Sequence, residues 1–155
     1  MGTNVFKINQ VVLADDDADH GVLFKTLLQE VDSSKNVTIL HDGDSLLAYL
    51  AHTAPELLFL DLNMPCKSGL ECLQEIKKMD HLKNMKIVVY SSSSSMNDIH
   101  SCYMWQADLY MVKPFNREHL KIALKSVLNL DWAGTRGNKY YYINNRFVPY
   151  TASPL

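Results

Sequence analysis

The sequence predicts a single α/β domain in which one parallel β-sheet is covered by helices on both faces. Short apolar runs alternate with segments whose apolar residues recur at helical spacing, and this order is repeated five times. The 155 residues fall in the size range of one domain, and 47% of them are hydrophobic, enough to fill one core. Strict alternation of strands and helices favours right-handed crossovers and therefore parallel strands.

The expected strands are short apolar runs with the length and composition of strands that are buried on both faces. Several are rich in β-branched residues, the third is wholly apolar, and the fifth is the weakest pattern of the set. In chain order, the expected strands are 11–14, 37–40, 57–60, 87–90 and 109–112.

The expected helices carry apolar residues three or four positions apart, so one face of each helix can pack on the sheet. The second helix is preceded by Asp42-Gly43-Asp44-Ser45, which is a turn and helix-cap signal. In chain order, the apolar faces lie within 22–31, 46–50, 70–79, 99–104 and 120–128. We therefore place the predicted domain at residues 1–128.

The composition changes after Leu128, where an aromatic segment begins. Residues 129–155 contain four of the eight tyrosines of the chain. This tail is too short for a helix-turn-helix or winged-helix module. We expect an arm without a domain of its own, in which 139–150 forms a short strand or extended segment against the domain or a second copy. A loosely ordered arm that covers apolar surface is the alternative.

The bulk composition excludes several classes of function. The net charge of -2 provides no basic field that could hold nucleic acid or an anionic membrane. The three cysteines form no Cys-x-x-Cys pair, which favours free thiols in a reducing compartment. No run approaches the roughly 18 apolar residues of a membrane-spanning helix. We therefore expect a cytoplasmic protein that binds neither nucleic acid nor membranes directly.

Polar side chains follow four of the expected strands at the points where these strands end. In chain order they are Asp15 and Asp16, Asp61, Ser91, and Lys113. Because the carboxyl ends of parallel strands meet at one edge of a sheet, these groups should converge there. Carboxylates within roughly 5 Å of each other repel by about 3 kcal/mol at an effective dielectric of about 20. A hard divalent cation, most simply Mg²⁺, is the natural partner of such a cluster.

Three motifs resemble those of the receiver domains of two-component response regulators. They are Val11-Val12-Leu13-Ala14-Asp15-Asp16-Asp17, the stretch 55–65 with Gly69, and Lys113-Pro114-Phe115. The resemblance covers about residues 8–128 with compatible spacing. It implies a flavodoxin-like doubly wound fold with a five-stranded parallel sheet, strand order 2-1-3-4-5 and five helices. It also implies a single-domain protein similar to chemotaxis regulators.

The resemblance implies a role for each residue of the acidic cluster. It makes Asp61 the phosphoacceptor and Lys113 the basic partner of its carboxylate. It makes Asp15, Asp16 and Asp61, together with the backbone carbonyl of Asn63, the ligands of Mg²⁺, with Mn²⁺ as a second suitable ion. A carboxylate can form a mixed anhydride with phosphate when positive charge is positioned around it.

The resemblance also implies a conformational switch. Ser91 would donate to a phosphoryl oxygen, with Ser92 as the alternative if the register shifts by one residue, and Tyr110 would rotate in response. These movements would change the surface formed by the fourth helix, the fifth strand and the fifth helix. A cis peptide bond is further implied at Lys113–Pro114.

The sequence thus predicts a phosphorylation-dependent switch of a two-component phosphorelay, which catalyses only its own phosphorylation and dephosphorylation. The implied partners are a sensor histidine kinase or phosphotransfer protein, a downstream target protein, and a second copy of the chain. The alternative is a receiver-shaped interaction module that is not phosphorylated. A metal-dependent aspartyl phosphatase is disfavoured, because Asn63 stands where that class uses an acid. A flavodoxin-like electron carrier is disfavoured because the aspartates would repel its phosphate.

Overall fold

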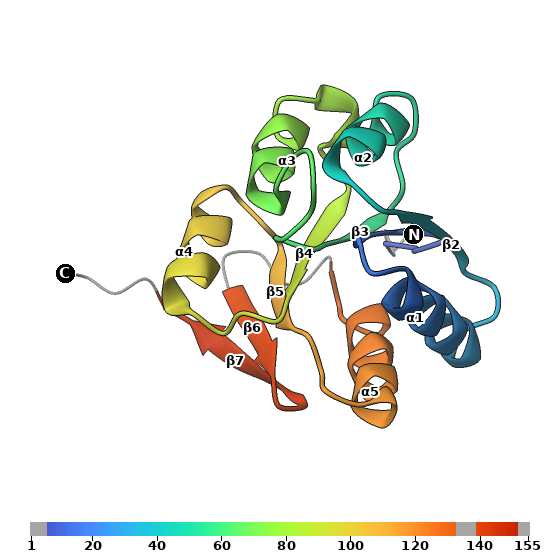
Figure 1. Cartoon of the computed structure of the whole chain (residues 1–155). Coiled ribbons are helices and arrows are strands. Elements are labelled where there is room, and N and C mark those ends of the chain that lie inside the picture. Colours follow the sequence, from blue (N-terminus) through green and yellow to red (C-terminus); the bar gives the residue numbers. More distant parts are fainter. Residues whose placement is uncertain (1–5, 133–138, 152–155) are drawn as a thin grey trace, which may run out of the picture.

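A β-sheet runs through the centre of the structure (Figure 1). The computed structural model of the chain describes residues 6–132 and 139–151. Within these residues the strands are β1 (Gln10–Ala14), β2 (Asn36–Leu40), β3 (Leu57–Leu60), β4 (Lys86–Ser91), β5 (Leu109–Val112), β6 (Lys139–Ile143) and β7 (Arg146–Tyr150). Their order is β2-β1-β3-β4-β5-β6-β7, and all neighbouring pairs are parallel except β6 and β7. The predicted order 2-1-3-4-5 is confirmed, and two further strands extend the sheet beyond β5.

Helices cover both faces of the sheet, as the sequence predicts. Within the described residues the α-helices are α1 (Ala18–Val31), α2 (Gly43–Leu50), α3 (Gly69–Ile76), α4 (Met96–Met104) and α5 (Arg117–Leu128), and a short 3₁₀ helix covers Asp80–Leu82. Helices α1 and α5 lie on one face, whereas α2, α3 and α4 lie on the other (Figure 1). None of these helices is long and apolar enough to cross a membrane.

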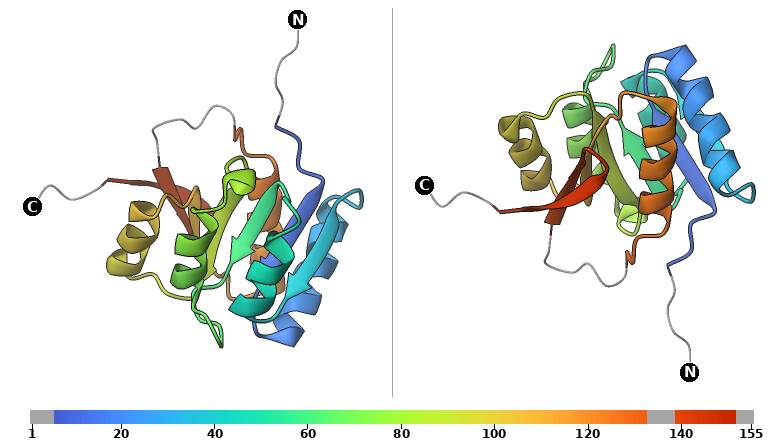
Figure 2. Two further views of the ribbon diagram at one scale, coloured as in Figure 1. Left: turned by 90° about the horizontal axis from the view of Figure 1, so that it is seen from above. Right: turned by 90° about the horizontal axis from the view of Figure 1, so that it is seen from below.

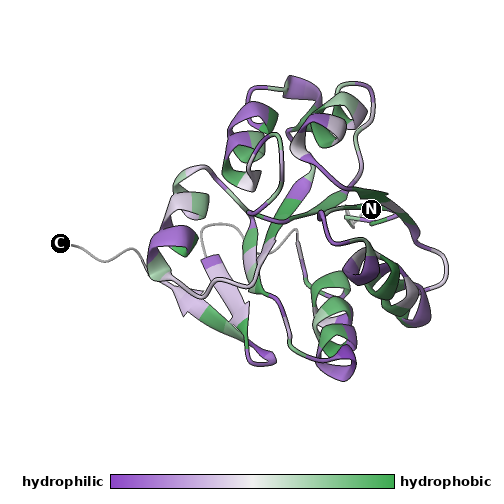
Figure 3. Cartoon of the chain, in the orientation of Figure 1, coloured by the Kyte–Doolittle hydropathy of each residue, from purple (hydrophilic) through white to green (hydrophobic). Residues whose placement is uncertain are grey.

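Alternate residues of each strand point to opposite faces of the sheet, so the strands contribute to two separate apolar cores. Leu13 and Tyr90 pack in the core beneath α1 and α5. Val12 and Val89 pack in the core beneath α2, α3 and α4. In Figure 3 the hydrophobic parts of the helices face the sheet. Strands β1 and β3 lie in parallel register, so the ends of β1 and β3 lie side by side.

The described part of the aromatic tail forms a β-hairpin on the edge of the sheet (Figure 2). Strand β6 pairs with β5 of the same chain, with Tyr142 opposite Met111. Asn144 and Asn145 connect β6 to β7 with φ angles of 51° and 66°, as a two-residue type I′ turn requires. Tyr142 is only 1% exposed, so the hairpin takes part in the core beneath α5. Residues 133–138 and 152–155 of the tail lie outside the described residues.

Candidate functional site

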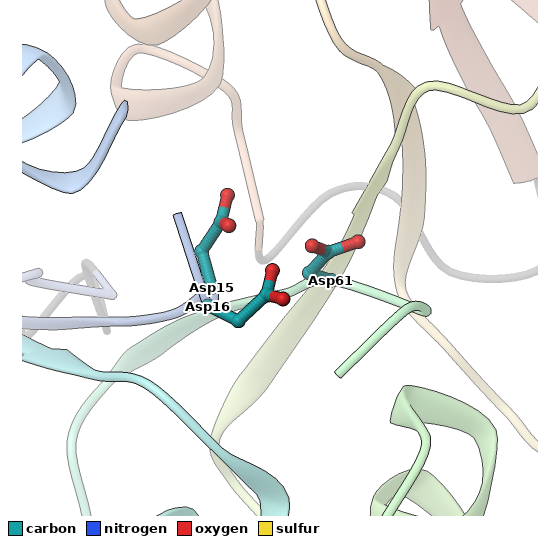
Figure 4. Close-up of side chains that lie close together, drawn as sticks. All are labelled: Asp15, Asp16 and Asp61. Atoms are coloured by element: carbon teal, nitrogen blue, oxygen red, sulfur yellow. The ribbon is translucent and has the colours of Figure 1, made fainter. Parts of the chain in front are cut away.

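The ends of β1 and β3 bring three aspartates together (Figure 4). The backbone N–H of Asp15 donates to the backbone carbonyl of Leu40 (2.9 Å), and the backbone N–H of Asp61 donates to the backbone carbonyl of Ala14 (3.0 Å). Both aspartates thus continue the hydrogen bonding of the sheet beyond their strands. One carboxylate oxygen from each of Asp15, Asp16 and Asp61 lies within 4.8 Å of the other two. Asp15 and Asp61 are buried, whereas Asp16 is exposed and can be reached from solvent.

Lys113 brings a positive charge to this cluster from the end of β5. Its Nζ donates to Oδ2 of Asp15 (2.9 Å) and to Oδ2 of Asp61 (3.3 Å). Its backbone N–H donates to the carbonyl of Ser91 (2.8 Å), which ties the ends of β4 and β5 together. The Lys113–Pro114 bond is trans, so the expected cis bond is wrong. The long, flexible lysine stem reaches both carboxylates without it.

Burial and the neighbouring charges have opposite effects on Asp61 and on Lys113. Burial raises the pKa of Asp61, because the removal of water disfavours the carboxylate more than the charge of Lys113 favours it. Burial also opposes the charged form of Lys113, but its contacts with Asp15 and Asp61 outweigh this effect and raise its pKa. The cluster contains three carboxylates and is contacted by the single ammonium group of Lys113, so a further positive charge would stabilise it. Hard oxygen donors of this kind fit Mg²⁺ or Mn²⁺.

The loop after β3 is folded tightly around Asp61. The backbone N–H of Asn63 donates to Oδ1 of Asp61 (3.2 Å). Gly69 donates to the carbonyl of Leu62 (2.9 Å), and a Cβ at Gly69 would lie 2.1 Å from the carbonyl oxygen of Asp61. A capping box between Ser68 and Glu71 then starts α3. Glycine is therefore required at position 69 by close backbone approach. That the backbone carbonyl of Asn63 binds the metal ion stays a prediction.

The loop between β4 and α4 links the two residues of the predicted switch. The Ser91 side chain is buried, and its Oγ accepts a hydrogen bond from the backbone N–H of Ser93 (3.1 Å). The buried Tyr110 donates its hydroxyl proton to the carbonyl of Ser93 (2.9 Å). A cavity of about 210 Å³, lined in part by Asn63, Ser91 and Asp98, lies between the loop after β3, the end of β4 and helix α4. The roles of Ser91 and Tyr110 in switching stay predictions.

The sequence did not single out His20 and Tyr90, which adjoin the site. Nε2 of His20 and the hydroxyl of Tyr90 lie 2.6 Å apart, and Nζ of Lys113 lies 5.1 Å from the centroid of the Tyr90 ring. Burial lowers the pKa of His20, which favours its neutral form. The two residues are separated by 70 positions in the chain, so no local motif joins them. The one signal in the sequence is the position of Tyr90, an aromatic residue with a hydroxyl group directly before the predicted switch residue Ser91.

Residues 11–125 match the family described as response regulator receiver domain. The chain belongs to this family. Receiver domains are signalling rather than catalytic proteins, and they typically accept phosphate from histidine kinases. The acidic pocket of Asp15, Asp16 and Asp61 is consistent with a phospho-accepting site.

Relatives of this receiver domain include cyanobacterial response regulators. Response regulator Rcp1 of Synechocystis is 30% identical over 117 residues, which cover 71% of this chain and 80% of Rcp1. The crystal structure of the phosphorylated cyanobacterial phytochrome response regulator RcpA superposes on this chain with a TM-score of 0.75. The two sequences are 29% identical, and the match covers 83% of this chain and 96% of RcpA. The Mn²⁺-bound form of Rcp1 is 28% identical with a TM-score of 0.66, covering 77% of this chain and 91% of that one.

Proposed function

We propose that this receiver domain accepts a phosphoryl group on Asp61 and acts as a switch in a two-component phosphorelay. The observation that carries the proposal is the placement of Lys113, whose ammonium contacts the carboxylates of both Asp15 and Asp61. A carboxylate oxygen of Asp61 would form a bond to phosphorus while the bond from phosphorus to the donor's imidazole nitrogen breaks. The electron pair of that bond leaves with the imidazole. The reaction therefore needs mainly positioning and charge neutralisation.

The residues around Asp61 have distinct tasks in this proposal. Asp15, Asp16 and Asp61, with the Asn63 carbonyl, would hold Mg²⁺ or Mn²⁺. The bound ion supplies positive charge to the phosphoryl oxygens. Lys113 would exchange its contact with Asp61 for one with a phosphoryl oxygen, since its flexible stem allows a small displacement. The Mn²⁺-bound structure of the relative Rcp1 supports the choice of ion.

The phosphoryl group would act on the loop that contains Ser91. It adds a charge of roughly -1.5 to -2 and new acceptor oxygens, to which Ser91 could donate. Ser93 in the same loop contacts both Ser91 and Tyr110, so a shift of the loop changes the surroundings of Tyr110. The backbone N–H of Tyr110 donates to the hydroxyl of Tyr103 on α4 (3.0 Å). The signal would thus reach the surface of α4, β5 and α5.

The hairpin lies directly on this signalling surface. Tyr103 of α4 donates a hydrogen bond from its hydroxyl to the carbonyl of Tyr140, and its ring lies 4.7 Å from the ring of Tyr150. We therefore include the hairpin in the surface that a downstream target would read. A second copy of the chain is a further proposed partner. The outer strand β7 contains Pro149, which lacks an N–H group and makes this edge a poor template for another strand.

Beryllofluoride, a phosphoryl analogue, distinguishes this function from an interaction module that is not phosphorylated. With Mg²⁺, it is expected to raise the thermal unfolding midpoint of the wild type. A ligand that binds only the folded state stabilises it by about 2.7 kcal/mol at a hundredfold excess over its Kd. The matched variant Asp61→Asn should show no shift beyond that caused by Mg²⁺ alone. An unshifted wild type, or equal shifts in the two proteins, would contradict the proposal.

A further inference from the structure

We propose that Tyr90 is a positioning residue, whose aromatic face holds the ammonium group of Lys113 between Asp15 and Asp61. This inference deepens the proposed function and rests on it where the rate of phosphorylation is concerned. The position of the lysine itself can be measured without any phosphoryl donor. Tyr90 would act on the reaction only through Lys113.

The ammonium group of Lys113 is contacted from three sides. Two contacts are the carboxylates of Asp15 and Asp61, at 2.9 Å and 3.3 Å. The third is the ring of Tyr90, whose centroid lies 5.1 Å from Nζ. A cation at this distance from an aromatic face is attracted by the negative charge density of the ring. The Lys113 side chain is 20% exposed, so the attraction acts in a partly desolvated setting.

The ring of Tyr90 is itself held in place at several points. Tyr90 is fully buried, and the rings of Phe24 and Phe59 meet it at interplanar angles of 62° and 83°, with centroids 5.7 Å and 5.9 Å away. On the α1 side, the ring of His20 stacks on it at 5.4 Å and shares a hydrogen bond with its hydroxyl. The ring therefore offers a fixed surface to Lys113.

A fixed surface matters because the lysine stem is flexible. A four-carbon stem gives the ammonium many positions, and each unproductive position lowers the share of molecules that are ready to react. An aliphatic residue at position 90 would fill the core but would not attract the cation. The aromatic face favours the position in which Nζ touches both carboxylates, which is where a transferred phosphoryl group needs positive charge.

Proton NMR tests the position of Lys113 directly, without Mg²⁺ or phosphodonor. The Cε protons of Lys113, assigned by their loss in Lys113→Met, should be shifted upfield by the ring of Tyr90. The variant Tyr90→Phe keeps the ring and should keep this shift, whereas Tyr90→Leu should lose it. An ordinary lysine shift in the wild type, or an upfield shift that persists in Tyr90→Leu, overturns the proposal. The wild-type spectrum alone decides if Tyr90→Leu fails to fold.

The rate of phosphorylation by acetyl phosphate at saturating Mg²⁺ provides the second readout. Tyr90→Leu should react about 3- to 30-fold more slowly than the wild type, as expected for the loss of a cation–π contact. Tyr90→Phe should stay within about twofold, because the ring face is retained. Equal losses in the two variants would assign the effect to the hydroxyl and overturn the inference. A wild type that takes no phosphate contradicts the proposed function, while the NMR result still reports on Tyr90.

Discussion

Replacement of Lys113 by methionine is expected to slow the phosphorylation of the chain by acetyl phosphate about 100- to 1,000-fold, the usual cost of removing one preorganised electrostatic contact. Methionine keeps a long, unbranched stem but carries no charge. Asp15 and Asp61 would then face the incoming phosphoryl group without the ammonium that contacts both of them. The initial rate of mass gain at saturating Mg²⁺ measures the effect.

A surface lysine provides the matched control for this measurement. Lys121 on α5 pairs with Glu30 on the neighbouring α1, and neither residue belongs to the carboxylate cluster. Lys121→Met removes the same charge from the chain and should leave the rate unchanged. A loss of less than tenfold in Lys113→Met, or an equal loss in both variants, would show that Lys113 does not act at the reacting phosphoryl group.

Replacement of Tyr142 by alanine is expected to lower the free energy of unfolding by about 3–5 kcal/mol, the usual range for truncating a large buried aromatic residue. Tyr142 is 1% exposed, and its ring packs against that of Phe147 at a centroid distance of 5.0 Å. It also pairs across from Met111 on β5, so its loss weakens the junction between the hairpin and the sheet. Urea unfolding followed by circular dichroism measures the difference.

Phenylalanine at the same position separates core packing from other effects. Tyr142→Phe keeps the ring that fills the core and should change the free energy of unfolding by less than about 1.5 kcal/mol, as volume-conserving substitutions usually do. If Tyr142→Ala lowers the free energy of unfolding by less than about 1 kcal/mol, the hairpin does not contribute to the core in solution. Its inclusion in the signalling surface would then be wrong.

The repeated strand–helix pattern made most of the fold predictable. Runs such as 57–60 are apolar throughout because both faces of a central strand are covered, and this is visible in sequence. The sequence of the tail did not distinguish a strand that joins the sheet from a loosely ordered arm. Tyr140, Tyr141 and Tyr142 are consecutive aromatic residues, and only the pairing with β5 decides which of them enters the core. Such pairing depends on contacts far apart in the chain.

The candidate site was predictable where its residues follow strand ends. The gathering of Asp15, Asp16 and Asp61, with Lys113 beside them, follows from parallel strands that end at one edge. The Tyr90 ring next to Lys113 could not be predicted in this way, because it lies within a strand and resembles an ordinary core residue. The Lys113–Pro114 bond is trans, whereas the family resemblance implies a cis bond. A proline lowers the cost of a cis bond but does not require one, so the sequence alone could not decide between the two.

The mass of the intact protein after incubation with acetyl phosphate and Mg²⁺ tests most directly whether Asp61 is the phosphoacceptor. We expect the wild type to gain the mass of one phosphoryl group and Asp61→Asn to gain none, because the amide cannot form the anhydride. A wild type that gains no mass, or an Asp61→Asn variant that gains as much as the wild type, would contradict the assignment.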